Sequence, residues 1–310
     1  YGSFETVFST AGGRRDSLIV VTDLGFEDSS ADAIVAHLSK AISQGCRLVW
    51  LDHHQWTQNG IKKVLSLGNK PVLRINHEYC AAEIAFRVLM PRDPICEELA
   101  RIAHDTDFNL RQIEAANALT DALSVIRFTV MDKGSDTTQA LMPLLEKLAH
   151  DGLDGLWDRE KQCFKDPMLE QRVRHYRKEK MKRMKKALLG HCDHVIHGRL
   201  VRVIELPRGV TTTDMGTFLC NPQNLQLENG ALPVADLIIT LGQGGKLGFR
   251  RGNDRVLCNR AAKLFSGGGH EYAAGGEYGP YEDFQAVCDD IFVTLSKDRS
   301  WIADQTDVSA

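Results

Sequence analysis

Residues 48–56, LVWLDHHQW, place an acid and two consecutive histidines directly after an apolar run that is typical of a buried strand. Another acid, Asp23, ends a second run rich in β-branched residues, SLIVVTDL at 17–24. Carboxylates and imidazoles together suit Mn²⁺ or a similar divalent ion. Two histidines beside an acid are costly to bury unless something binds them. We therefore predict that the Asp-His-His triplet and Asp23 contribute to a metal site; the alternative for Asp23 alone is to cap the next helix.

The elements expected around these residues form a β-α-β unit. Residues 17–24 and 46–51 predict strands, and the helical spacing of apolar residues between them predicts a helix that ends near Gly45. In an open parallel sheet, functional groups collect beyond the carboxyl ends of the strands. Asp23 and the triplet both follow such ends, so we expect them to lie side by side.

The remaining chain changes from helical to strand-like patterns. Helices are expected at 77–90, at 95–108, over most of 112–190 and at 281–296. Short strands are expected from about 193, including a hairpin at 235–252 with a glycine-rich turn. The predicted fold is therefore α/β with two domains. A parallel-sheet domain at 1–130 and a smaller mixed α/β domain at 191–303 are joined by a helical connector at 131–190.

Composition limits the classes of partner. The formal net charge of −3 over 310 residues gives no global attraction to nucleic acid or membrane. No apolar run approaches the roughly 20 residues of a membrane span. The eight cysteines are scattered and form no C-x-x-C pair, which favours reduced thiols in the cytoplasm. We expect a cytoplasmic protein without a membrane partner.

Five motifs, in order along the chain, resemble those of the DHH phosphoesterase superfamily. They are VVTDLG at 20–25, LDHHQW at 51–56, HEYCAAEIAF at 77–86, AHDTDF at 103–108 and FSGGGHEYAAGG at 265–276. The last resembles the hallmark of the DHHA1 domain that accompanies the RecJ-like and oligoribonuclease-like members. The resemblance extends over nearly the whole chain.

The resemblance implies a hydrolase, a metal-dependent phosphodiesterase of the exonuclease type, that acts on short oligonucleotides or nucleotides through a metal-activated water. The implied cofactor is a pair of Mn²⁺ ions, with Mg²⁺ as a substitute, and a homodimer is a compatible assembly. Two alternatives share this chemistry: an exopolyphosphatase or pyrophosphatase, and a cyclic-dinucleotide phosphodiesterase. A third alternative is a non-catalytic relative that binds nucleic acid.

The resemblance also implies roles for single residues. Asp23 would bridge the two ions, and His53 and Asp105 would ligate one of them. His54 would face the substrate phosphate, and Asp52 would orient an imidazole. In the second domain, the expected phosphate-binding residues are three glycines, a histidine and two arginines: Gly267, Gly268, Gly269, His270, Arg250 and Arg251.

Two features keep alternatives open. Asp107 is either a spare ligand or, as we expect, a cap of the turn after its helix. The helix expected at about 171–187 carries nine lysines and arginines. It either contacts a nucleic-acid backbone or is a solvated helix with Val173, Tyr176 and Met184 turned inward.

The superfamily's first motif, a His-x-Asp-x-Asp sequence that supplies three metal ligands, is absent from the chain. The opening residues 1–8, YGSFETVF, resemble the second strand of the family, so we expect the first motif upstream of Tyr1. The alternative is a degenerate member. Without these ligands, the chain is expected to bind metal poorly.

We predict that a chain extended at its N-terminus hydrolyses a dinucleotide in Mn²⁺ much faster than the chain that begins at Tyr1, because the extension would add three ligands. The measurement is product release by both chains at matched Mn²⁺. Equal and robust hydrolysis by the two would show that the first motif is dispensable.

Overall fold

The computed structural model describes residues 2–26, 31–68, 70–131, 137–228 and 230–303. It confirms the predicted α/β class. The chain divides into two compact units, Tyr1–Val173 and Arg174–Ala310, and the division lies within the stretch predicted as a connector. Within the described ranges, every helix is too short or too polar to cross a membrane.

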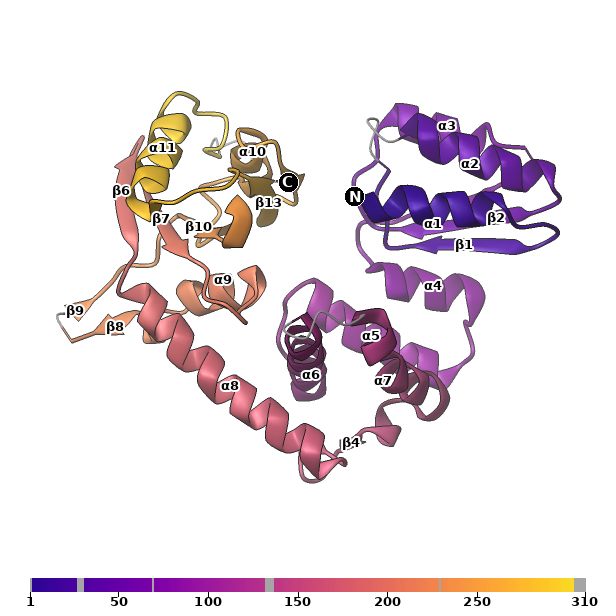
Figure 1. The fold of residues 1–310 in the computed structure, drawn as a ribbon, viewed down its shortest axis with the longest axis horizontal. Coiled ribbons are helices and arrows are strands. Elements are labelled where there is room, and N and C mark those ends of the chain that lie inside the picture. The colour runs from indigo at the N-terminus through magenta and orange to yellow at the C-terminus, as the bar shows by residue number, and fades with distance from the viewer. Residues whose placement is uncertain (1, 27–30, 69, 132–136, 229, 304–310) are drawn as a thin grey trace. The chain divides into compact units, whose positions relative to one another are not determined.

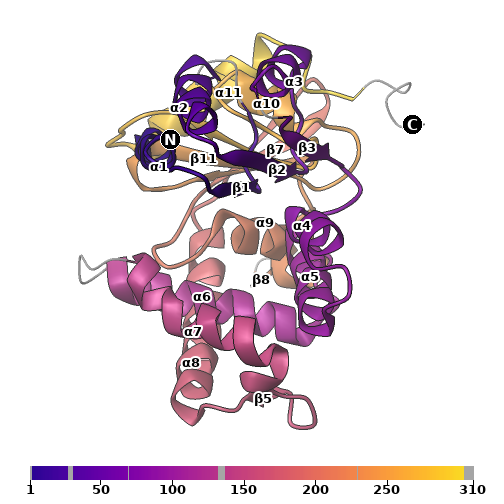
Figure 2. The same ribbon diagram turned by 90° about the vertical axis from the view of Figure 1, so that its right-hand side faces the viewer.

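The first unit is built on a parallel sheet. Its strands, in the order β1-β2-β3, are β1 (Leu18–Thr22), β2 (Arg47–Asp52) and β3 (Val72–Ile75). The helices around it are α1 (Gly2–Gly12), α2 (Ala31–Ser43), α3 (Gln58–Leu65) and α4 (Ala81–Leu89). Figures 1 and 2 show the first three over one face of the sheet and α4 on the other.

Residues 1–8 were predicted to resemble a strand, but residues 2–8 belong to α1, so that prediction was wrong; Tyr1 lies outside the described residues. Phe8 is buried and stacks on Trp50 of β2, with ring centroids 6.0 Å apart. Gly12 lets α1 approach α2, because a Cβ at this position would lie 3.2 Å from the carbonyl oxygen of His37. The helix therefore covers the sheet face and does not pair with a strand edge.

The first unit continues with helices and a short hairpin. These are α5 (Pro94–Asp107), α6 (Glu114–Met131), α7 (Thr137–Asp151), the 3₁₀ turn η1 (Leu153–Gly155), β4 (Trp157–Asp158) and β5 (Cys163–Phe164). The sequence at the start of α5 explains its position, since the Asp93 carboxylate accepts the N–H of Cys96 at 2.8 Å and Pro94 follows it. Helix α8 (Pro167–Leu188) crosses the division between the units.

The second unit contains a mixed sheet in the order β12-β13-β11-β10-β7-β6. Its strands are β6 (Cys192–Ile196), β7 (Arg199–Glu205), β10 (Leu237–Leu241), β11 (Lys246–Arg251), β12 (Gly268–Gly269) and β13 (Ala273–Glu277). The other elements are α9 (Thr212–Cys220), η2 (Pro222–Leu225), β8 (Gln226–Leu227), β9 (Gly230–Ala231), η3 (Gln243–Gly245), α10 (Cys258–Lys263) and α11 (Phe284–Ser296). The predicted hairpin is confirmed as β10 and β11, which pair antiparallel.

Both faces of this sheet are covered, and strand alternation explains why. In β10, Ile239 packs with residues of α10 and α11, whereas its neighbour Ile238 packs with residues of α8 and α9. A strand buried on both faces reads as a continuous apolar run, and LIITL in β10 is buried at every position.

One charged side chain lies inside this sheet. Arg202 of β7 is fully buried, and its Nε and Nη2 donate to the two carboxylate oxygens of Asp193 on β6 at 2.8 and 2.7 Å. Its Nη1 donates to the carbonyl oxygen of Pro233 at 3.1 Å. The two residues are direct partners in the β6–β7 register, so the strand pairing itself brings the charges together.

We predict that Asp193→Ala lowers the free energy of unfolding by about 3 kcal/mol, because it leaves a buried guanidinium without its counterion. Urea unfolding measures the loss. The double variant D193A/R202M is the matched control, and it should recover most of the stability because no buried charge remains. A single variant as stable as the parent would contradict a stabilising role for the pair.

Candidate functional site

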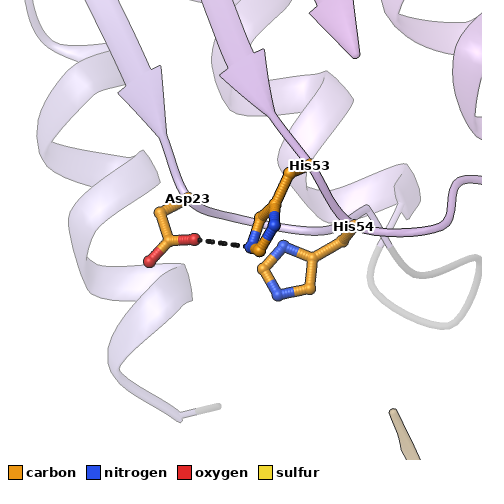
Figure 3. A group of neighbouring side chains, drawn as sticks. All are labelled: Asp23, His53 and His54. Carbon is orange, nitrogen blue, oxygen red and sulfur yellow. Dashed lines mark ion pairs between the residues drawn. The ribbon is translucent and has the colours of Figure 1, made fainter. Parts of the chain in front are cut away.

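Asp23 is positioned by an unusual backbone conformation directly after β1. Its φ is +57°, in the left-handed region that Asp tolerates better than most residues. Its N–H donates to the carbonyl oxygen of Leu51 at 3.1 Å, which extends the pairing of β1 with β2 by one residue. Figure 3 shows the result: the carboxylate points toward His53, with Oδ1 3.3 Å from Nε2.

His53 lies between two carboxylates. Its ring is almost wholly buried, and its Nδ1 is 3.4 Å from Oδ2 of Asp107. The contact with Asp23 raises the pKa of His53 above its usual value, although burial opposes this effect. The same contact lowers the pKa of Asp23. Two carboxylates around one imidazole thus create a site that favours positive charge, whether a proton or a cation.

Asp52 holds the second histidine. Its carboxylate is fully buried, with Oδ1 2.8 Å from Nδ1 of His54, and its Oδ2 accepts the indole N–H of Trp56 at 2.6 Å. Burial alone would raise the pKa of Asp52, but the hydrogen bonds from His54 and Trp56 outweigh it and the pKa is lowered. With Nδ1 directed at Asp52, the Nε2 atom of His54 lies on the opposite side of the ring.

The donor set suits a divalent ion. Asp23, His53 and His54 each offer one ligand atom, and these atoms all lie within 4.8 Å of one another. A histidine that binds a metal usually donates its other N–H to a carboxylate, which is the relation between His54 and Asp52. His54, predicted from the sequence to face phosphate, therefore has the geometry of a ligand as well.

The two acids at the end of α5 differ from their predicted arrangement. Asp105 is buried, its Oδ1 accepts the N–H of Gln112 at 2.9 Å, and it lies outside the group of three. Its Oδ2 is buried without a hydrogen-bond partner among the described residues. Asp107, expected to cap the turn, instead approaches His53. Residues two apart on a helix are related by a rotation of about 200° about its axis, so their side chains point in nearly opposite directions. Only one of the two acids can therefore face His53.

A cavity of about 680 Å³ borders this group in the first unit. Asp23 and Asp107 lie at its edge, and most of its remaining walls are apolar side chains of α4, α5, α6 and α7. Apolar walls do not hold a charged phosphoester, but they lower the local dielectric and so strengthen the electrostatic interactions of the two carboxylates.

The second unit has a cavity of about 240 Å³ that includes part of the predicted phosphate-binding set. Gly268, Gly269 and Arg250 line it, together with Thr212 and Thr213 at the start of α9. The two threonines were not identified from the sequence. Their signal was the series Thr211-x-x-Asp214 before an apolar run, which is a helix-capping pattern.

Three predicted residues of this set have other roles. The N–H of Gly267, which was expected to bind an anion, donates to the carbonyl oxygen of Ala262 at 2.9 Å. Gly267 is needed because a Cβ there would collide with the carbonyl oxygen of Gly275. Of the two arginines, Arg251 forms an ion pair with Asp254 at 3.1 Å and does not line the cavity.

His270 also lies outside the lining of this cavity. Its ring stacks on Tyr272, with centroids 5.1 Å apart and planes 5° from parallel. The glycine run before it forms β12, which pairs antiparallel with β13. The histidine therefore stands on the turn between two short strands.

Comparison with known proteins found no matching family model and no matching curated protein. Solved structures that match include an uncharacterized protein from Helicobacter pylori G27, with 15% identity, TM-score 0.33, and 96% of this chain and 88% of that chain covered. An exopolyphosphatase-related protein from Bacteroides fragilis matches with 14% identity, TM-score 0.43, and coverages of 96% and 76%. The pGpG-specific phosphodiesterase PggH from Vibrio cholerae matches with 15% identity, TM-score 0.43, and coverages of 91% and 99%. Likeness at this level assigns neither a family nor an activity to this chain.

We predict that the pKa of His54 in the metal-free protein lies above about 6.5 and falls in Asp52→Asn, because the contact with Asp52 is the main cause of its rise. NMR titration of the imidazole protons measures it. The exposed acid Asp32 supplies the control, since Asp32→Asn should leave the His54 titration unchanged. Equal effects of the two variants would contradict the conclusion that Asp52 raises the pKa of His54.

The contact between His54 and Asp52 also makes the stability of the fold depend on pH. Because the folded-state pKa of His54 is raised and that of Asp52 is lowered, the charged pair stabilises the fold between the two values. The contribution of His54 is lost as pH rises through its folded pKa, and that of Asp52 is lost as pH falls through its own.

Proposed function

We propose that the protein is a metal-dependent phosphoesterase that hydrolyses short oligonucleotides or nucleotides. The observation that carries the proposal is the grouping of one carboxylate and two imidazoles, with all ligand atoms within 4.8 Å, beyond the carboxyl ends of two parallel strands. Carboxylate and imidazole donors in this arrangement suit a divalent ion.

Asp23, His53 and His54 would hold the ion, and Mn²⁺ fits their mixed oxygen and nitrogen donors. A bound divalent ion would polarise a phosphoryl oxygen and lower the pKa of a water. The chain's own residues prepare the site. Asp52 accepts from Nδ1 of His54 and thereby turns Nε2 outward, and Asp107 places a second carboxylate on the other nitrogen of His53.

Asp107 also affects the protonation of His53 when no metal is bound. With carboxylates near both ring nitrogens, His53 is readily protonated, and the proton must leave before the ring can ligate an ion. Carboxylates at 3.3 and 3.4 Å provide acceptors for that proton without any movement of the backbone. Ion binding is therefore expected to weaken as pH falls through the pKa of His53.

The cavity of the second unit supports an anionic substrate. Arg250 supplies a fixed positive charge, Thr212 and Thr213 supply hydroxyl groups, and Gly268 leaves the wall open, since a Cβ there would have no neighbour within 4 Å. A volume of about 240 Å³ is smaller than that of a typical pocket for a whole drug-sized ligand. It suits one phosphate or base of a short substrate.

We predict that His53→Ala weakens Mn²⁺ binding by at least about tenfold, because it removes the central ligand of the group. Electron paramagnetic resonance of unbound Mn²⁺ measures the affinity. His150→Ala, an exposed histidine of the same unit, is the matched control and should bind like the parent. Identical affinities of the parent and the H53A variant would refute the metal site.

The chain extended at its N-terminus and its H53A variant decide the substrate class. Hydrolysis of a dinucleotide, of polyphosphate, of pyrophosphate and of a cyclic dinucleotide is compared in Mn²⁺. The proposal requires the dinucleotide to be the preferred substrate and H53A to be inactive on it. Preference for polyphosphate or pyrophosphate would retain the chemistry and overturn the substrate, and no hydrolysis of any of the four would overturn the enzyme.

A further inference from the structure

Four lysines of α8 form a stripe along one exposed side of the helix. Lys178, Lys182, Lys185 and Lys186 follow the spacing i, i+4, i+7, i+8, which places them on a single face. All four side chains are exposed. The opposite side of the helix packs into the second unit, where Met184 and Leu188 join the core beside α9. We call these four residues the lysine stripe.

Other cations of α8 are used within the protein. Lys180 forms an ion pair with the buried carboxylate of Asp214 at 3.2 Å, and Arg183 donates to the carbonyl oxygen of Arg208 at 2.8 Å. By contrast, none of the lysines of the stripe forms an ion pair with any carboxylate in the described ranges. The stripe is thus a concentration of uncompensated positive charge on a chain whose formal net charge is −3.

Helix stability does not explain the stripe. Cations in the last turn interact favourably with the helix dipole, and this accounts for Lys185 and Lys186. It does not account for Lys178 and Lys182, which lie before the last turn. Like charges at a spacing of four repel each other and destabilise a helix, and the pairs Lys178–Lys182 and Lys182–Lys186 both have this spacing.

We propose that the lysine stripe is a binding surface for the phosphate backbone of nucleic acid, separate from the candidate metal site. From Lys178 to Lys186 the stripe spans about 12 Å of helix, over which duplex DNA carries about seven charges. Lysine ammoniums act as point charges that contact phosphates without reading bases. An anionic membrane is a poorer partner, because Met184 and Leu188 of α8 are buried in the core of the second unit and cannot insert.

The test measures binding in the full chain without hydrolysis. Anisotropy of a fluorescein-labelled DNA duplex is recorded in EDTA over a range of salt concentrations, so the result does not depend on the proposed enzyme activity. The stripe variant is K178Q/K182Q/K185Q/K186Q. The matched control is K40Q/K62Q/K147Q/K297Q, which removes the same charge from four exposed lysines elsewhere.

Loss of four phosphate contacts should reduce the slope of log K against log salt by about 3.6 in the stripe variant. Its affinity at low salt should fall at least about tenfold, and two duplexes of unrelated sequence should bind equally. An unchanged slope, an equal fall in the control variant, or binding only to phosphatidylserine vesicles would overturn the proposal. Thermal unfolding followed by circular dichroism excludes misfolding. The stripe variant should unfold near the temperature of the parent, because the relief of like-charge repulsion offsets the lost interaction of Lys185 and Lys186 with the helix dipole. If the variant nevertheless unfolds, the single variants K178Q and K182Q should each lower the slope by about 0.9.

Discussion

The candidate site depends on the register between two parallel strands. Thr22 of β1 is paired with Leu51 of β2, and the N–H of Asp23 continues this pairing with the Leu51 carbonyl. The strand pairing therefore makes Asp23, which follows β1, a neighbour of His53, which follows β2. Because side chains alternate along a strand, a shift of one strand by one residue would turn its side chains to the opposite face. Neither Asp23 nor His53 could then reach the other.

Aromatic packing holds this register in place. Trp50 of β2 is fully buried, and its ring centroid lies 5.6 Å from that of Phe26 and 5.0 Å from that of Trp56. Its indole N–H donates to the carbonyl oxygen of Leu24. Leu24 and Phe26 follow β1, and Trp56 follows β2. The Trp50 side chain thus contacts the loops after both strands. Trp56 in turn donates a hydrogen bond to the buried carboxylate of Asp52. An apolar cluster therefore positions the site together with its polar contacts.

The sequence predicted the parts of the site that are local. Strand ends are visible as apolar runs, so the proximity of Asp23 to the histidine pair followed from the expected β-α-β unit. The sequence did not predict which side of α5 faces His53. AHDTDF offers acids at two positions, and only packing decides which of them approaches His53. The structural requirement for Gly267 was not visible for a related reason. Its glycines were expected to expose N–H groups, whereas Gly267 is required by the close approach of another strand. Contacts between segments far apart in the chain decided both cases.

Positive charge in the second unit occurs in two physically different forms. Arg250 lines a cavity beside backbone and hydroxyl groups, where its planar guanidinium can select one geometry of anion. The lysine stripe lies on an open helix face, where flexible ammoniums remain hydrated and salt screens them strongly. The first arrangement gives specificity with few charges, and the second gives long-range attraction with little specificity. A chain with a net negative charge can use both only because the charges are segregated, and α8 achieves this by burying one side of the helix and exposing the other.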